Sequence, residues 1–386
     1  MKPKKILFPF ISILIGIFLS FTILELIFRV LPTRDSLMQL PVNQTNPVIR
    51  FKENRDVIWS HGANFSIVTK KHVNNYGFLN DQNYFTEDNS PLLAIIGDSY
   101  VEAAQVENKD ALHGILSQAA AGKARVYSFG ASGSALSTYL AYAKYATEEF
   151  NATALVFIIV GNDFDESLTK YKDAPGFHYF SSASDRLNLV RKDYQPTLIK
   201  RLSRQAALIR YLVLNILLNW QSMGNIFVTD TENAEEKYVG NTRANVDEER
   251  ISDSKKAVNR FFEELPLQTN LGVDKILFVI DGMRPHLYNP MALRKANGSY
   301  FDLMRKYFIE VAVNKGYEVI DMQPVFIMKH KSEGIRFEIP SDGHWNEDGH
   351  RLVAEKIKAS TVYRALFKSV WIQPAYRSLD SIQQRL

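Results

Sequence analysis

From about residue 90 onward, short apolar runs alternate with stretches of helical spacing. The runs are nearly continuous, which is typical of strands that are buried on both faces of a sheet. The predicted strands are Leu92–Ile96, Arg125–Phe129, Ala154–Val160, Lys275–Ile280 and Tyr317–Ile320. The predicted helices between and around them cover about 100–120, 137–149, 247–264 and 299–315. This alternation predicts an α/β fold, a three-layer α/β/α sandwich with a central, mainly parallel five-stranded sheet.

The longest apolar run lies at the N-terminus. Ile6 to Leu24 are 19 residues without a charge, close to the ~20 residues that cross a bilayer core. Three lysines among the first five residues favour a cytoplasmic tail at 1–5, with the bulk of the chain exported. We therefore expect an uncleaved transmembrane anchor at 6–28. A cleaved signal peptide is the main alternative, but the run is long for one and no small-x-small cleavage site follows it. A buried soluble helix would need a partner core this early in the chain.

Polarity divides the remaining sequence into three parts. Residues 29–90 are polar with turn signals, and we expect a stalk and lead-in there. The main domain follows at 91–368, and a C-terminal tail at 369–386. An insertion at about 165–246 interrupts the alternation of strands and helices. Its apolar stretch at 196–222 contains interspersed arginines and predicts an amphipathic helix, which either packs on the domain or serves as a lid or membrane-surface helix.

Composition narrows the chemistry. The chain of 386 residues has 46 Lys and Arg against 42 Asp and Glu, a net charge of +4. This excess is too small and too scattered for a nucleic-acid surface. With no cysteine, the chain has no disulfides, no thiolate nucleophile and no Cys-ligated zinc. The eight histidines are scattered without metal-ligand spacing, so we expect no metal or other cofactor.

Residues with catalytic potential follow the predicted strands, where sites in parallel sheets lie. Ser99 comes directly after the first strand and begins a helix, whose N–H groups can stabilise an oxyanion. A serine becomes a good nucleophile only when a base removes its proton. Taken alone, Ser99 is explained equally well as a helix N-cap.

A candidate base lies before the last predicted helix. His344 follows Asp342 by two residues in a loop rich in glycine and polar residues. This spacing lets one loop present both side chains, so that the carboxylate fixes the tautomer of the imidazole. The alternative is that both are ordinary turn residues and that Asn346 caps the helix.

Two further candidates follow the second and third strands. Gly130 and Gly133 allow a backbone N–H to approach a bound oxygen closely, and Asn162 offers an amide donor. A tight turn would explain the glycines, and a helix cap would explain Asn162. The order of nucleophile, backbone donor, amide donor and Asp–His loop favours a single active site.

Four segments, GDSYVEA, GASG, GND and DGHWNEDGH, resemble in order and spacing the motifs of the SGNH (GDSL-type) hydrolase superfamily. The resemblance covers about residues 90–360. It implies an SGNH/flavodoxin-like fold and a triad of Ser99 as nucleophile, His344 as base and Asp342 as orienting acid. It also implies an oxyanion hole formed by the Ser99 N–H, Gly133 and Asn162. Residues near these motifs and after the fourth strand are possible substrate contacts: Asp163, Arg284, His286 and Trp345.

The sequence departs from the usual motifs. Tyr100 stands where GDSL has leucine, and the last motif is Asp-x-His where much of the superfamily has Asp-x-x-His. The shorter form followed by Trp345 is similar to members that handle acyl groups on bacterial exopolysaccharides, including the alginate acetylation proteins. VNNYGFLND resembles a segment of membrane-tethered bacterial members, with Leu79 where arginine is usual. A rival triad using His286 would leave the last motif unexplained.

The sequence thus predicts a serine esterase in the inner membrane, with its N-terminus inside and its catalytic domain on the periplasmic side. The expected substrate is an acylated glycan or lipid-linked sugar, with O-acetyl as the expected acyl group. The same triad would also serve an O-acyltransferase. A non-catalytic glycan-binding scaffold in an envelope glycan-modification or export complex is the alternative from another class. A lipase acting on the membrane rests only on the apolar stretch at 196–222.

Overall fold

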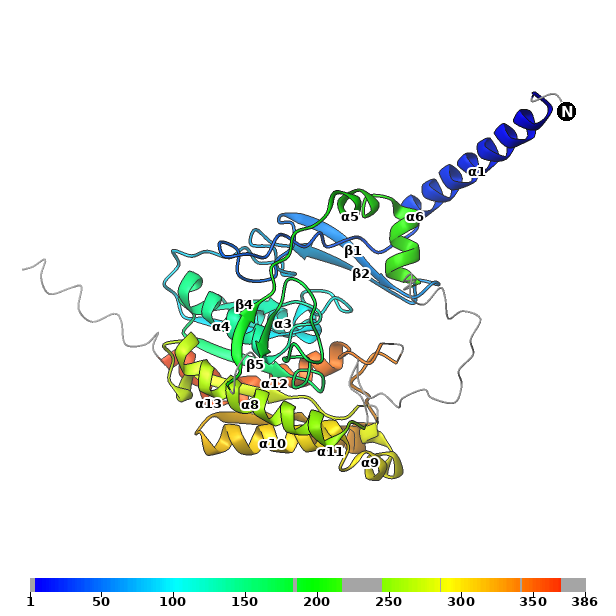
Figure 1. The fold of residues 1–386 in the computed structure, drawn as a ribbon. Coiled ribbons are helices and arrows are strands. Elements are labelled where there is room, and N and C mark those ends of the chain that lie inside the picture. Colours follow the sequence, from blue (N-terminus) through cyan, green and yellow to red (C-terminus); the bar gives the residue numbers. More distant parts are fainter. Residues whose placement is uncertain (1–3, 183–185, 217–244, 285, 341, 369–386) are drawn as a thin grey trace, which may run out of the picture.

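A computed structural model describes residues 4–182, 186–216, 245–284, 286–340 and 342–368. Three expected segments lie largely outside the described residues: most of the cytoplasmic tail, the part of the insertion from 217 to 244, and the C-terminal tail at 369–386. Figure 1 shows an α/β domain with one long helix projecting from it.

A five-stranded sheet forms the centre of the domain, in the order β4-β3-β5-β8-β9. Every pair of neighbours is parallel. The strands are β3 (Leu92–Gly97), β4 (Arg125–Gly130), β5 (Ala154–Ile159), β8 (Ile276–Ile280) and β9 (Glu318–Asp321). All residues of β3, β4, β5 and β8 are buried, which explains their continuous apolar runs. The predicted fold class is confirmed, and all five predicted strands are present.

Helices cover both faces of this sheet. The strand order reverses direction after β4, so right-handed crossovers place α3 on one face and α4, α8 and α10 on the other. The C-terminal helices α12 and α13 join the face of α3, since α12 packs on α3. The bounds are α3 (Leu112–Ala120), α4 (Leu136–Phe150), α8 (Glu248–Gln268), α10 (Tyr300–Asn314), α12 (Glu347–Ala359) and α13 (Thr361–Lys368). Shorter elements on the same two layers are η2 (Val273–Lys275), η3 (His286–Tyr288), α9 (Pro290–Ala296) and α11 (Met322–Glu333).

The helix expected at about 100–120 is divided in two. The short α2 (Ser99–Glu102) ends at Ala103, whose φ of 48° is left-handed, and α3 begins at Leu112. Side chains from the preceding segment hold the break. Lys71 donates to the carbonyls of Ala103 and Val106, at 2.9 and 2.7 Å. These bonds replace the intrahelical partners that the carbonyls lose where the helix stops.

Residues 29–90, expected to form a stalk and lead-in, pack against the main domain as part of its core. They contain an antiparallel hairpin, β1 (Arg55–His61) and β2 (Ile67–Val73). Further along, the ring of Tyr84 stacks on Tyr127 of β4 with a centroid distance of 3.8 Å. The hairpin lies between the domain and the base of the N-terminal helix (Figure 1).

The insertion also has structure within its described part. It forms a second hairpin, β6 (His178–Ser181) and β7 (Asn188–Arg191), and then α5 (Leu198–Ser203), α6 (Ala207–Arg210) and the π-helical turn η1 (Tyr211–Asn215). The single amphipathic helix expected at 196–222 is therefore interrupted between α5 and α6. Leu198, Ile199 and Leu202 of α5 are exposed rather than packed on the domain.

The N-terminal helix α1 (Lys4–Val30) contains a span, Pro9–Val30, that is long and apolar enough to cross a membrane by length and composition. Its last turns contact α6 and η1. The Glu25 carboxylate accepts hydrogen bonds from the N–H groups of Ala207 and Leu208, at 3.0 and 2.9 Å. The ring of Phe28 stacks on Tyr211 at 4.0 Å. Helix α1 is therefore fixed to the domain at its end.

Candidate active site

Ser99 is the first residue of α2, directly beyond the carboxyl end of β3. Asp98 is the N-cap, and its Oδ1 accepts the N–H of Tyr100 at 2.9 Å. The turn requires a residue without a side chain at Gly97, because a Cβ there would lie 2.5 Å from a methyl group of Val101. The sequence thus raises the hydroxyl of Ser99 above the sheet at the start of a helix.

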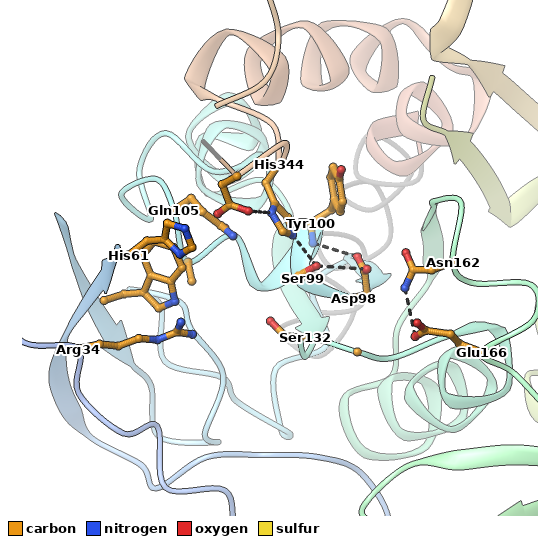
Figure 2. Close-up of a pocket in the computed structure, with 14 residues that line it drawn as sticks. Arg34, His61, Asp98, Ser99, Tyr100, Gln105, Ser132, Asn162, Glu166 and His344 are labelled. Carbon is orange, nitrogen blue, oxygen red and sulfur yellow. Dashed lines mark hydrogen bonds and ion pairs between the residues drawn. The ribbon is translucent and has the colours of Figure 1, made fainter. Parts of the chain in front are cut away.

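The Asp–His loop reaches this serine from the far end of the chain. His344 Nε2 lies 2.8 Å from Ser99 Oγ, and His344 Nδ1 lies 2.5 Å from Asp342 Oδ1. Gly343 between them has a φ of 81°, a left-handed conformation that few other residues adopt readily. The three side chains form a continuous hydrogen-bonded relay across 245 residues of sequence (Figure 2).

The charge of Asp342 is stabilised within this relay. Burial alone would raise the pKa of the Asp342 carboxyl, but hydrogen bonds from His344 and Gln105 and the potential of His344 hold that pKa below its usual value. An ionised carboxylate on Nδ1 leaves the lone pair of Nε2 directed at the serine. The geometry of the relay is therefore the one that a serine nucleophile requires.

Asn162 follows β5 and lies on the opposite side of Ser99 (Figure 2), and Gly133 follows β4 and lines the same cavity. Gly133 has a φ of 84°. Asn162 Nδ2 donates to Glu166 Oε2 at 3.2 Å. Lys172 Nζ donates to the same Oε2 at 2.5 Å and to the carbonyl of Gly133 at 2.7 Å. One lysine thus connects the two segments that the sequence assigned to an oxyanion hole.

Asp98 is a second buried carboxyl beside the nucleophile. Its side chain is 2% exposed. Burial raises the pKa of Asp98 to about 6, although hydrogen bonds from Tyr100 and Ser99 and the charge of His344 act in the opposite direction. The carboxyl next to Ser99 therefore changes charge in a mildly acidic range.

A cavity of about 510 Å³ opens over Ser99. Its lining residues come from the lead-in, the strand ends and the Asp–His loop: Arg34, Trp59, His61, Asp98, Ser99, Tyr100, Ala104, Gln105, Ser132, Gly133, Asn162, Glu166, Asp342 and His344. Sequence motifs pointed to the strand-end and loop residues. They gave no signal for Arg34, Trp59 and His61, because these come from a segment whose packing on the domain no local pattern reveals.

The four possible substrate contacts do not line this cavity. Asp163 is fully buried and accepts hydrogen bonds from the Tyr139 hydroxyl and the Val160 N–H, both at 2.8 Å. His286 lies in η3, also outside the lining. Asp163 and His286 therefore belong to the strand-end loops but do not face the cavity.

Arg284 and Trp345 lie beneath the Asp–His loop. Arg284 forms a buried ion pair with Asp281 at 2.6 Å and donates to the carbonyl of Gly343 at 3.1 Å. Trp345 Nε1 donates to Asp281 Oδ1 at 3.0 Å. All their polar partners are internal, so these residues support the loop that carries His344 instead of facing a ligand.

Within the described residues, no group of three or more His, Asp or Glu side chains is arranged to hold a metal ion.

No family model and no curated protein matches the sequence. Among solved structures, the chain is similar to LAE5, an α/β hydrolase from the metagenome of Lake Arreo (14% identity, 71% of this chain and 95% of that chain, TM-score 0.38). It is also similar to the acetyl xylan esterase AlAXEase (12% identity, 69% of this chain and 98% of that chain, TM-score 0.36). A third similar structure is the lipase/acylhydrolase from Enterococcus faecalis (11% identity, 72% of this chain and 96% of that chain, TM-score 0.36).

Such distant similarities assign no activity. The strand order, the serine after β3 and the Asp–His loop before α12 are features of the chain itself. They agree with the positions that the motif resemblance implied for a serine and its Asp–His loop.

Proposed function

We propose that the protein is a serine esterase of the SGNH type, which removes short O-acyl groups from a glycan. The observation that carries this proposal is the relay from Asp342 through His344 to Ser99, with hydrogen bonds of 2.5 and 2.8 Å. A helix cap or a turn would account for each residue singly. Neither accounts for the contact between a serine and a histidine 245 residues apart.

In the first half of the reaction, His344 Nε2 accepts the proton of the Ser99 hydroxyl as Oγ attacks the ester carbonyl. The carbonyl oxygen becomes an oxyanion, which the N–H groups of Ser99 and Gly133 and the amide of Asn162 stabilise. The bond between the carbonyl carbon and the alcohol oxygen then breaks. His344 donates its proton to the leaving alcohol, and the acyl group remains on Ser99.

In the second half, an acceptor oxygen attacks the acyl-enzyme. His344 takes the acceptor proton and returns it to Ser99 Oγ as the ester bond to the serine breaks. With water as acceptor, the product is a carboxylic acid and the enzyme is an esterase. A sugar hydroxyl in the same position would make the protein an O-acyltransferase with the same residues.

The lining of the cavity supports a small acyl group and a polar alcohol. Charged and polar side chains, with Arg34, Gln105 and Glu166 among them, share the lining with apolar surfaces such as that of Trp59. A long acyl chain would have to bury part of its methylene groups against the polar side chains, which is unfavourable. An acetyl group needs little apolar surface, and a sugar offers hydroxyls to the polar walls. The lining therefore favours an acetylated glycan over a lipid substrate.

The proposed location is the outer face of the inner membrane, with α1 as the anchor. The length and hydropathy of α1 and the lysines at its N-terminus support this location. A glycan of the cell envelope, or its lipid-linked precursor, is the substrate that such a position makes accessible.

The test uses the full chain in detergent with p-nitrophenyl acetate and butyrate, together with a serine-directed phosphonate followed by intact mass. We expect one adduct, which is absent in Ser99→Ala. Turnover should fall by about 10³-fold or more in Ser99→Ala and in His344→Gln, as for other triads. Acetate should be preferred to butyrate.

The matched control is His72→Gln, because His72 lies outside the cavity and pairs with Asp56. This variant should react with the phosphonate and turn over the ester like the parent chain. An adduct that persists in Ser99→Ala, or a folded parent chain that neither reacts nor turns over, would contradict the proposal and favour the scaffold.

A further inference from the structure

One wall of the cavity over Ser99 is built by the lead-in segment. Trp59 and His61 are two positions apart on β1, so both side chains lie on the same face of the strand, and both line the cavity. Their rings stack with a centroid distance of 6.1 Å and an angle of 12°. Arg34, which follows α1 closely in sequence, places its guanidinium 4.7 Å from the centre of the Trp59 ring. We call these three residues the lead-in wall.

Within the described residues, the Arg34 guanidinium stacks on the Trp59 ring but forms no direct hydrogen bond or ion pair. Burial lowers the pKa of Arg34, while the negative charges of Glu102 and Asp342 raise it. An arginine remains charged in a protein, and a partly desolvated cation is unfavourable until an anion pairs with it.

The same wall has a second unmet polar group. Trp59 is 4% exposed, and its indole Nε1 has no hydrogen-bond partner among the described residues. A buried N–H without a partner costs about 1–3 kcal/mol. The Trp59 N–H is enclosed, whereas Arg34 lines the cavity, so the guanidinium is the group that suits a ligand with a negatively charged oxygen.

The position of the wall indicates which part of an ester it would meet. His344 must protonate the alcohol oxygen that leaves, so the alcohol lies on the His344 side of Ser99, away from Gly133 and Asn162. Figure 2 shows Arg34 and His61 on this side, and Asn162 and Glu166 on the other. The lead-in wall therefore faces the alcohol part of the ester rather than its acyl group.

We propose that Arg34, Trp59 and His61 form a subsite for an anionic group on the alcohol part of the substrate, so that the substrate is an acidic glycan or a sugar phosphate. Carboxylate and phosphate share the chemistry that this wall recognises. The Arg34 guanidinium pairs with the anion, and the cavity-lining rings of Trp59 and His61 contact the sugar. The assignment to the alcohol part rests on the proposed esterase function.

Binding is measured first, because it needs no turnover. Glucuronate, glucose 6-phosphate and glucose are titrated into the full chain in detergent by calorimetry, in a buffer free of phosphate. We expect at least one anion to bind about tenfold more tightly than glucose. Arg34→Met should remove this preference and Arg34→Lys should retain part of it. The stronger anion identifies the source of the negative charge.

The control for binding is Arg50→Met. Arg50 belongs to the same lead-in and also lies over an aromatic ring, that of Tyr145, but it does not line the cavity. This variant should bind the sugars like the parent chain. Equal binding of all three sugars, or a preference that survives in Arg34→Met, would overturn the subsite.

Turnover then tests which part of the ester the subsite meets. The two substrates are 4-acetoxybenzoate, with an anionic alcohol part, and 4-acetoxybenzamide, its neutral counterpart. Arg34→Met should lower kcat/KM about tenfold for the benzoate and less than twofold for the benzamide. An equal loss on both would mean that Arg34 only balances the charges of Glu102 and Asp342. If neither ester is hydrolysed, the proposed function fails, while the binding result still decides on the subsite.

Discussion

The two walls of the cavity differ in origin. The sheet wall, with Gly133, Asn162 and Glu166, follows the carboxyl ends of β4 and β5. The lead-in wall comes from the segment between α1 and the domain and from the hairpin strand β1. In the proposed reaction, the sheet wall offers N–H donors to an oxygen whose charge develops during catalysis. The lead-in wall offers a permanent cation and an aromatic surface. One wall is suited to the reacting carbonyl and the other to the identity of the substrate.

This difference means that variants of the two walls should have different kinetic signatures. A donor that acts on the transition state changes kcat, whereas a group that binds a remote part of the substrate equally before and during the reaction changes KM. Variants of the residues around Ser99 should have the largest effects, and they complement the test of Arg34.

The largest effect should come from Asn162→Ala, which removes the side-chain donor of the sheet wall. Loss of one oxyanion donor typically lowers kcat by about 10²–10³-fold. We expect a decrease of this size in p-nitrophenyl acetate turnover with little change in KM. Asn297→Ala, an exposed position outside the cavity, is the control and should behave like the parent chain. A change confined to KM would contradict the role of Asn162 as an oxyanion donor.

The next effect concerns stability and depends on pH. The pKa of Asp98 is raised to about 6 by burial, so its neutral form stabilises the fold and this contribution is lost as the pH rises through 6. Asp98→Asn resembles the neutral acid and keeps an acceptor for the Tyr100 N–H.

The free energy of unfolding of Asp98→Asn should therefore exceed that of the parent chain by a margin that grows between about pH 4 and pH 6. Above pH 7 this margin should reach about 2–3 kcal/mol. Urea unfolding of the full chain in detergent, followed by tryptophan fluorescence across this range, measures it. A margin that is constant with pH would show that Asp98 ionises at its ordinary pKa.

The smallest effect should come from Lys172→Met. Lys172 donates to the Gly133 carbonyl and to Glu166, and its removal leaves the Glu166 charge near the developing oxyanion. We expect kcat to fall about tenfold with KM nearly unchanged, which corresponds to about 1.4 kcal/mol.

Two further variants test this explanation. Lys170→Met changes the neighbouring lysine, which pairs with Glu249 and Asp253 outside the cavity, and should have no effect on turnover. Glu166→Gln combined with Lys172→Met should recover part of the lost rate. If the double variant is no faster than Lys172→Met, the carboxylate does not oppose the oxyanion.

The sheet wall and the lead-in wall also differ in how far their residues could be predicted from the sequence. Buried parallel strands leave continuous apolar runs, and their ends carry glycine and small polar residues, so the sheet and the positions of Ser99, Gly133 and Asn162 could be predicted. His344 could be paired with Ser99 only through motif resemblance, because 245 residues separate them. The catalytic roles of these residues stay predictions until the variants are measured.

Other features had no local signal. The contact of Arg34 with Trp59 depends on how the lead-in packs on the domain, and residues 29–90 have the polarity of a stalk. Conversely, Trp345 adjoins His344 in sequence and Arg284 follows the fourth predicted strand, yet folding turns both side chains inward to Asp281. Proximity to a motif in sequence therefore does not predict exposure to the cavity.

The attachment of α1 to the domain limits where the cavity can act. Arg34 in the cavity wall follows Val30, the last residue of α1, by four positions, a distance of at most about 14 Å even for an extended chain. Glu25 and Phe28 fix the angle of the helix through α6 and η1. If α1 is the anchor proposed above, the cavity would stay at one height above the lipid, and its encounters with substrate would take place in two dimensions.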